Sequence, residues 1–214
     1  MTTRANAEVV TIKAPNMAEA QFRIVGTAPL VIRRFDEKVR QEFADKIIHG
    51  STPAGKKKHA ARQIDDIYEA AKYYGETDGE RWEGFNASAI RNAMISACRL
   101  VNFKMTLAKL SVFVIEDGRD LKDPLIALVR IYGASRISEA VGRTSGMSQA
   151  PMLTIRPMYY PWESMLRIRY DADQFKLADI ANLLARVGAQ VGIGEGRPDS
   201  HSSAGMGWGL FDIA

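Results

Sequence analysis

Cysteine and histidine are both scarce in this chain of 214 residues, which has one cysteine and three histidines. The single Cys98 excludes an intramolecular disulfide, and the absence of a Cys/His cluster leaves no ligand set of the zinc type. No stretch reaches the roughly 18 apolar residues that a membrane-spanning helix needs, and residues 1–14 lack the apolar run of a signal peptide. We therefore expect a cytoplasmic protein with no membrane segment, no metal and no cofactor.

Recognisable catalytic motifs are sparse as well. His49, His59 and His201 share no useful spacing, and the chain has no Gly-x-Ser-x-Gly nucleophile motif. The acidic pair Asp65 and Asp66 is typical of an exposed helix face and does not by itself indicate a metal site. The sequence nominates no catalytic residue and favours a non-catalytic protein, with an enzyme left open.

Positive charge exceeds negative charge modestly, with a formal net charge of +4 and a pI near 9.2. Such an excess favours an acidic partner such as nucleic acid only where it is clustered. The densest cluster is Lys56, Lys57 and Lys58, in a loop that also contains Pro53 and Gly55. Phosphate neutralisation by these lysines predicts salt-dependent, sequence-tolerant binding; the alternative is an ordinary solvated loop.

Hydrophobic periodicity and breaker residues predict the secondary structure. Amphipathic helices are expected at 36–48, around 64–71, at 86–103 (capped by Asn86 or Ser88) and at 173–188 (capped by Asp173 and ended by Gly188). Strands are expected at 21–25, 110–115, 125–132, 165–170 and 208–213, with 110–115 and 125–132 forming a possible hairpin. Residues 133–151 are expected to form a long protruding loop carrying Arg136 and Arg143.

Without the intervening segments, these elements follow the order strand, helix, strand, strand, helix, strand. That order is the split βαβ arrangement of a ferredoxin-like fold, which RNA-recognition modules also use. We therefore expect a single α+β domain over residues 1–214 with an antiparallel sheet and helices on one face. Long insertions are expected near 27–84 and 118–164.

Glycine is concentrated near the end of the chain, in residues 191–200 and 205–209. Glycine supplies positive φ and lets the backbone approach a phosphate closely, so a loop shaped around a ligand is expected, with Arg197 and His201 as donors. The alternative is a packing loop with tight turns. A dinucleotide site is not expected, because this segment follows a helix and leads into a strand. The glycines concerned are Gly192, Gly194, Gly196, Gly205 and Gly207.

Three segments in order resemble motifs of the RAMP superfamily of CRISPR-associated proteins. They are residues 26–30, the helix start at 85–94 and the Gly-rich segment at 192–209, although Asn92 stands where that family commonly has glycine. Similarity to the backbone subunits of CRISPR effector complexes, or to a phage or mobile-element relative, implies a ferredoxin-like palm. It also implies finger-like and thumb-like insertions and head-to-tail assembly along a guide RNA.

Several basic residues are candidates for contact with nucleic acid. Ser88 and Arg91 at a helix start can meet phosphates through hydroxyl, guanidinium and backbone amides, with Arg99 two turns later; the alternative is a helix cap and a solvated face. Tyr159, Tyr160 and Trp162 lie near Arg156 in sequence and could stack on bases, although core packing is favoured. The full candidate set is Lys56, Lys57, Lys58, Ser88, Arg91, Arg99, Arg136, Arg143, Arg197 and His201.

The leading hypothesis is a non-catalytic protein that binds RNA or single-stranded DNA and assembles into a homo-oligomer or a larger ribonucleoprotein. One alternative is an endoribonuclease of the same superfamily that uses His201 or His59 as a general base. Another is a phage structural or protein-interaction component that binds no nucleic acid.

Overall fold

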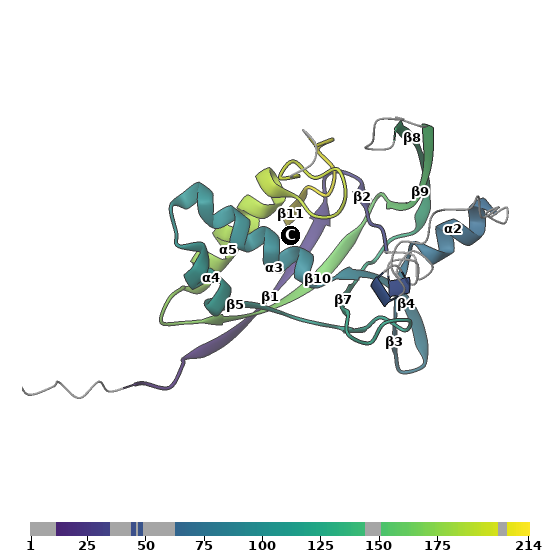
Figure 1. Cartoon of the computed structure of the whole chain (residues 1–214). Coiled ribbons are helices and arrows are strands. Elements are labelled where there is room, and N and C mark those ends of the chain that lie inside the picture. The colour runs from purple at the N-terminus through teal and green to yellow at the C-terminus, as the bar shows by residue number, and fades with distance from the viewer. Residues whose placement is uncertain (1–11, 35–43, 46, 49–62, 144–150, 201–204) are drawn as a thin grey trace, which may run out of the picture.

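The computed structural model describes residues 12–34, 44–45, 47–48, 63–143, 151–200 and 205–214. Helices and antiparallel strands give it an α+β architecture (Figure 1). The helices are α2 (Ile64–Ala70), α3 (Ser88–Ala97), α4 (Met105–Ser111) and α5 (Leu177–Arg186), followed by short helical turns at Cys98–Val101 and Val187–Val191. The strands are β1 (Met17–Gly26), β2 (Leu30–Val31), β3 (Tyr73–Thr77), β4 (Glu80–Asn86), β5 (Val112–Ile115), β6 (Gly118–Arg119), β7 (Ala127–Arg130), β8 (Ser135–Arg143), β9 (Pro151–Tyr159), β10 (Glu163–Asp171) and β11 (Phe211–Ile213).

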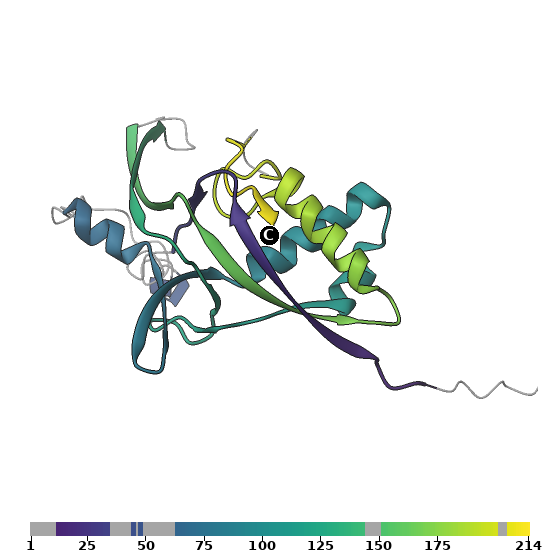
Figure 2. The same cartoon turned by 180° about the vertical axis from the view of Figure 1, so that it is seen from behind.

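The central sheet has the strand order β11-β1-β10-β5, and every neighbouring pair is antiparallel. Strand β10 shows why the sheet has one buried face: Leu166, Ile168 and Tyr170 are buried, whereas the alternating residues Arg167 and Arg169 are exposed. This alternation is the period-two pattern of a strand with one face in the core. Figures 1 and 2 show α3 and α5 on the same side of this sheet.

Apolar side chains on α3 and α5 fill the space over the buried face of the sheet. Ile90 and Met94 on α3, together with Ile180 and Leu184 on α5, have no exposed surface. Their spacing of four residues places each pair on one side of its helix. Full burial of each such side chain stabilises the fold by about 1.5–3 kcal/mol, so this layer holds both helices against the sheet.

Two smaller sheets are built from the segments where insertions were expected. One has the order β2-β9-β8 and the other β3-β4-β7-β6. Strands β8 and β9 form a long antiparallel hairpin that projects from the body of the protein (Figure 1). A buried ion pair fixes the segment after β2 to the turn after β6: Arg34 Nε lies 2.9 Å from a carboxylate oxygen of Asp120. Asp120 also accepts the backbone N–H of Tyr74, so three segments meet there.

Two expectations about strands are wrong. Residues 110–115 and 125–132 do not form a hairpin, because β5 pairs with β10 and β7 pairs with β4 and β6 in another sheet. Residues 133–151 are not simply a loop, because Ser135–Arg143 is strand β8. The hairpin of β3 and β4 was not predicted at all, since its apolar residues are interrupted by glycines and charges.

The helix ends also differ from expectation. Asp173 does not cap α5; that helix begins after Lys176, whose backbone N–H donates to the Asp179 carboxylate. Gly188 does not end the helix either, because it packs against the Phe211 carbonyl inside a π-helical turn that continues to Val191. The helix expected at 36–48 lies largely outside the described residues, although residues 44–45 and 47–48 are helical.

Core packing is confirmed for Tyr159 and Trp162 but not for Tyr160. Tyr159 is fully buried and Trp162 is 2% exposed, whereas Tyr160 is 49% exposed. The Trp162 indole N–H donates to the Ala28 carbonyl, which ties β10 to the segment after β1. Within the described residues, none of the helices has the length and hydropathy needed to cross a bilayer.

Candidate nucleic-acid interface

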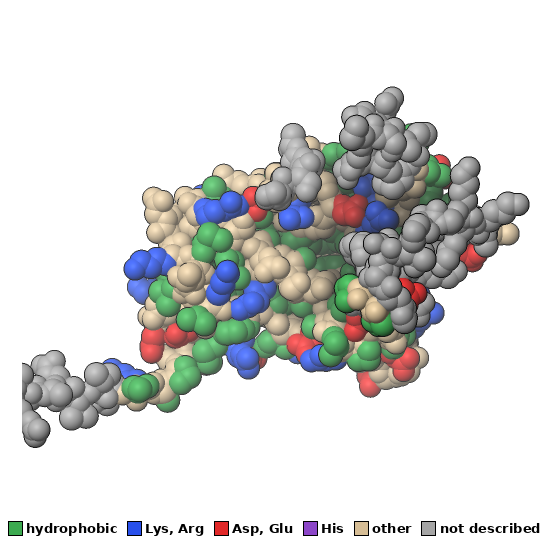
Figure 3. Space-filling view, viewed as in Figure 1, with side chains coloured by type: hydrophobic (Ala, Val, Ile, Leu, Met, Phe, Trp, Pro, Cys, Tyr) green, Lys and Arg blue, Asp and Glu red, His purple; other side chains and the backbone are tan. Residues whose placement is uncertain are grey.

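A groove of about 480 Å³ separates α3 from the Gly-rich segment that follows α5. Its floor is apolar, and its rim carries arginine, carboxylate and amide side chains. Figure 3 shows this face, with a hollow whose floor is hydrophobic and whose upper edge carries charges of both signs. The lining residues include Leu30, Ile32, Phe85, Ala93, Val191 and Ile193 on the floor, and Arg33, Asn92, Ser96, Glu195, Arg197 and Asp199 on the rim.

The Gly-rich segment (residues 192–209) has a backbone that only glycine accommodates easily. All five glycines singled out in the sequence, Gly192, Gly194, Gly196, Gly205 and Gly207, have φ between 69° and 75°. Gly194 also has no room for a side chain, since a Cβ there would lie 2.4 Å from the Val31 carbonyl oxygen. Tight turns and close packing therefore both explain the glycines, so their density alone does not indicate a ligand.

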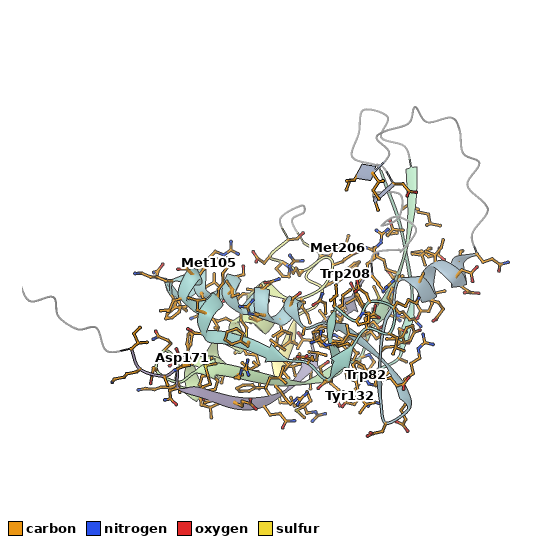
Figure 4. The ribbon with its side chains drawn as sticks, turned by 60° about the horizontal axis from the view of Figure 1, so that its bottom comes forward. Trp82, Met105, Tyr132, Asp171, Met206 and Trp208 are labelled. Atoms are coloured by element: carbon orange, nitrogen blue, oxygen red, sulfur yellow. The ribbon has the colours of Figure 1, made fainter. Side chains whose placement is uncertain are left out.

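Backbone hydrogen bonds attach the Gly-rich segment to the residues that follow β1. The Glu195 N–H donates to the Val31 carbonyl and the Gly209 N–H to the Pro29 carbonyl, each at 2.8 Å. Met206 and Trp208 lie together between the helices and the projecting hairpin (Figure 4). The fold thus brings Leu30, helix α3 and the Gly-rich segment, which are far apart in sequence, to one groove.

Two arginines line this groove, and two more form ion pairs with acids on its rim. Arg33 and Arg197 line it directly, and Arg197 donates to the Gly194 carbonyl at 3.0 Å. Arg156 on β9 pairs with Glu195 at 2.8 Å and is only 12% exposed, and its Nε has no hydrogen-bond partner. Arg99, just after α3, pairs with Asp199. Each rim carboxylate is therefore paired with an arginine from outside the lining, and Arg33 and Arg197 add positive charge on the rim itself.

Asp199 joins the Gly-rich segment to α3. Its carboxylate accepts hydrogen bonds from the Ser96 hydroxyl and from Arg99, the latter at 2.6 Å. Burial acts to raise the pKa of the Asp199 carboxyl, but the hydrogen bonds from Ser96 and Arg99 outweigh it and hold that pKa below its ordinary value. Asp199 is therefore ionised at neutral pH and partly neutralises Arg99.

Ser88 and Arg91 lie away from this groove. They line a separate pocket of about 320 Å³ on the opposite side of α3, beside Val114 and Leu125. The Arg91 guanidinium donates to the Val112 carbonyl at 3.0 Å and to the Lys109 carbonyl, so it satisfies the C-terminal end of α4. The Ser88 backbone N–H donates to the Asn86 side chain. The Arg91 contacts with α4 are structural and were not indicated by the sequence.

The remaining candidates divide between the hairpin and segments outside the described residues. Arg136 is exposed on β8, where its nearest polar contact is the Met158 sulfur at 3.8 Å. Arg143 ends β8, and its side chain is outside the described part of the structure. Lys56, Lys57, Lys58 and all three histidines, including His201, also lie outside it, so their roles stay predictions.

The open face of the central sheet has compensated charge. Arg167 lies 3.3 Å from the Asp117 carboxylate, and Arg23 pairs with Glu163. Arg169 is directly opposite Glu19 on β1. A sheet that stacks bases presents several aromatic rings on such a face. Each arginine here faces an acid instead, which makes this face less suited to a polyanion than the groove.

A polar cluster between α2, β3, β4 and β9 has the character of a structural network. The Lys72 ammonium lies 2.8 Å from Glu69 and 3.1 Å from Glu83, and the Tyr159 hydroxyl donates to Glu83 at 2.7 Å. Burial acts to lower the pKa of Lys72, but these two carboxylates outweigh it and raise that pKa above its usual value. A lysine that remains protonated is not a nucleophile or a base.

Cys98 and the acidic residues provide no reactive site in the described chain. Cys98 is fully buried at the end of α3, and burial raises the pKa of its thiol, which disfavours the reactive thiolate. Over the described ranges, no three His, Cys, Asp or Glu side chains come together in a group that could hold a metal ion.

Sequence reasoning missed five of the six rim residues: Arg33, Asn92, Ser96, Glu195 and Asp199. Arg33 is followed directly by Arg34, and the sequence does not indicate which of the two side chains is exposed. In the structure Arg33 is exposed and Arg34 is buried. Glu195 and Asp199 belong to the Gly-rich segment and each lies two residues from Arg197. Their closeness to Arg197 in the sequence could have marked them as site residues.

No protein-family model matches the chain, and no curated protein matches its sequence.

Proposed function

We propose that the protein binds RNA or single-stranded DNA, without catalysis, in the groove between α3 and the Gly-rich segment. The observation that carries this proposal is an apolar-floored groove lined by Arg33 and Arg197, whose two rim carboxylates are each paired with a further arginine, Arg99 or Arg156. Guanidinium groups suit phosphate recognition because they are always charged and donate in a planar fork. An apolar floor suits unpaired bases, which a duplex would keep stacked inside.

We further propose that the central sheet is a ferredoxin-like core. With the smaller sheets set aside, the core elements follow as β1, α3, β5, β10, α5 and β11, and the sheet order is β11-β1-β10-β5. This connectivity supports the split βαβ assignment. The Gly-rich segment then lies between the second core helix and the last strand, which is where the RAMP resemblance would place it.

Assembly into an oligomer or a ribonucleoprotein is part of the same proposal. Several large apolar side chains are exposed at opposite ends of the molecule: Val141 and Leu153 on the projecting hairpin, and Leu100, Val101 and Leu110 near the ends of α3 and α4. Separate exposed apolar patches are typical of surfaces that contact a partner. Two different patches on one chain support head-to-tail contacts, which close into rings or propagate as filaments.

The experiment is size-exclusion chromatography of the purified protein with light scattering and absorbance at 260 and 280 nm, before and after nuclease and high salt. A large assembly with a raised 260/280 ratio that falls on nuclease treatment is the expected result. A nucleic-acid-free monomer that also fails to bind added oligonucleotides would contradict the proposal and favour a protein-interaction role.

A further inference from the structure

We propose that the groove between α3 and the Gly-rich segment takes one unstacked nucleobase of the bound strand, so that recognition there goes beyond the phosphate backbone. This inference rests on the proposed function. The groove has a volume of about 480 Å³, which falls in the range of about 300–1,000 Å³ typical of small-molecule sites. A site that gripped phosphates alone would need charged donors but no enclosed apolar floor.

The floor of the groove supplies the apolar surface that a base requires. Leu30, Phe85 and Ile193 are at most 1% exposed, so they pack beneath the floor and support it. The apolar surface open to a base comes from partly exposed lining residues such as Ala89. Leu30 lies beside Gly194, which allows the backbone to approach the Val31 carbonyl closely. A base has two apolar faces and a polar edge, so this floor can cover a face while the rim meets the edge.

Asn92 on the rim supplies the hydrogen-bonding chemistry for a base edge. It lies on the exposed side of α3, and its side chain makes no hydrogen bond to another described residue. A primary amide presents a donor and an acceptor side by side, which matches the adjacent acceptor and donor of a base such as adenine. Asn86 lines the same groove and keeps its amide N–H₂ group available, since its oxygen accepts from Ser88.

The arginines define which end of a nucleotide points inward. Arg33 is exposed at the mouth of the groove, and the Arg197 guanidinium is anchored at the Gly194 carbonyl on the same rim. Phosphates are therefore held at the mouth, and the base points toward the floor.

The test compares two single-stranded DNA oligonucleotides of equal length, one with normal bases and one built entirely of abasic units, by fluorescence anisotropy. Ala89→Leu adds three carbon atoms at a residue that lines the groove. Ser88→Leu is the matched control, because Ser88 lines the other pocket on the same helix turn. Circular dichroism and thermal melting establish that each variant is folded. Asn92→Ala, at an exposed position, serves as a second variant if Ala89→Leu fails to fold.

The wild type is expected to bind the normal strand about tenfold more tightly than the abasic strand. Ala89→Leu should remove that preference and leave abasic binding unchanged, Asn92→Ala should reduce the preference severalfold, and Ser88→Leu should change neither. Equal binding of both strands, or a preference that survives Ala89→Leu and Asn92→Ala, would overturn the base pocket while leaving backbone binding in place. Failure of the wild type to bind either strand would overturn the proposed function as well.

Discussion

The guanidinium of Arg99 lies 2.6 Å from the carboxylate of Asp199, across 100 residues of sequence. This contact joins the end of α3 to the Gly-rich segment and closes one side of the groove. It also sets a carboxylate against a cation that a phosphate could otherwise engage. The pair thus stabilises the loop and lowers the positive charge of the rim at the same time.

Asp199→Asn should raise affinity for single-stranded nucleic acid, because it removes a negative charge from the rim and frees Arg99. Anisotropy titrations at several salt concentrations measure this. For single strands the slope of log K against log salt is about −0.7 per neutralised phosphate, so a slope steeper by up to about 0.7 is expected. Weaker binding by the variant, with an intact fold, would show that Asp199 only positions the loop.

The Arg99–Asp199 pair also makes the stability of the protein depend on pH. Because the pKa of Asp199 is lowered in the folded state, its contribution is present above the ordinary carboxyl pKa and is lost as pH falls through the folded value. Arg99 is 55% exposed and Asp199 34% exposed, so solvent screening limits the contribution to about 0.5–1 kcal/mol. Urea unfolding of the wild type and Asp199→Asn should show this difference at pH 7, and the difference should shrink as pH falls below the ordinary carboxyl pKa.

Gly209→Ala should destabilise the protein far more than Gly207→Ala. Both glycines have φ near +70°, but a Cβ at Gly209 would lie 1.8 Å from the Ile193 carbonyl oxygen, whereas nothing lies within 4 Å at Gly207. Backbone strain alone costs about 1–3 kcal/mol, which is the loss expected for Gly207→Ala. Gly209→Ala adds a clash with backbone and should cost about 4 kcal/mol or more. Equal losses in urea unfolding would show that the Gly-rich segment is not packed as described.

Arg34→Ala should be among the most destabilising single changes in the chain. Arg34 and Asp120 have side chains 3% and 1% exposed, so the variant leaves a buried carboxylate without its cation. Such a change typically costs about 3–5 kcal/mol. Arg119→Ala is the matched control, because its partner Glu116 is solvent-accessible and an exposed pair contributes about 0–1 kcal/mol. Chemical unfolding that shows similar losses for both variants would contradict the buried pair.

The sequence predicted the core elements better than it predicted the site. Strands at 21–25 and 165–170 and the helix after residue 86 were predictable, because their periodicity reflects one buried face. The pairing of β5 with β10 was not predictable, since strand partners depend on contacts far apart in sequence. Arg33 and Arg34 show the same limit for the site. They are neighbours with the same chemistry, yet Arg33 reaches the groove and Arg34 is buried against Asp120, 86 residues away.

The central claim is that single-stranded nucleic acid binds in the groove rather than on the open face of the sheet. The most direct measurement is the salt dependence of oligonucleotide affinity for the wild type, for Arg33→Ala/Arg197→Ala, and for the sheet-face control Arg167→Ala/Arg169→Ala. The groove variant should bind more weakly, and evenly so across sequences. Its slope of log K against log salt should be flatter by about 1.4, the value for two lost phosphate contacts. The control should retain the wild-type slope. Unchanged affinity and slope in the groove variant, with a loss in the control, would contradict the account.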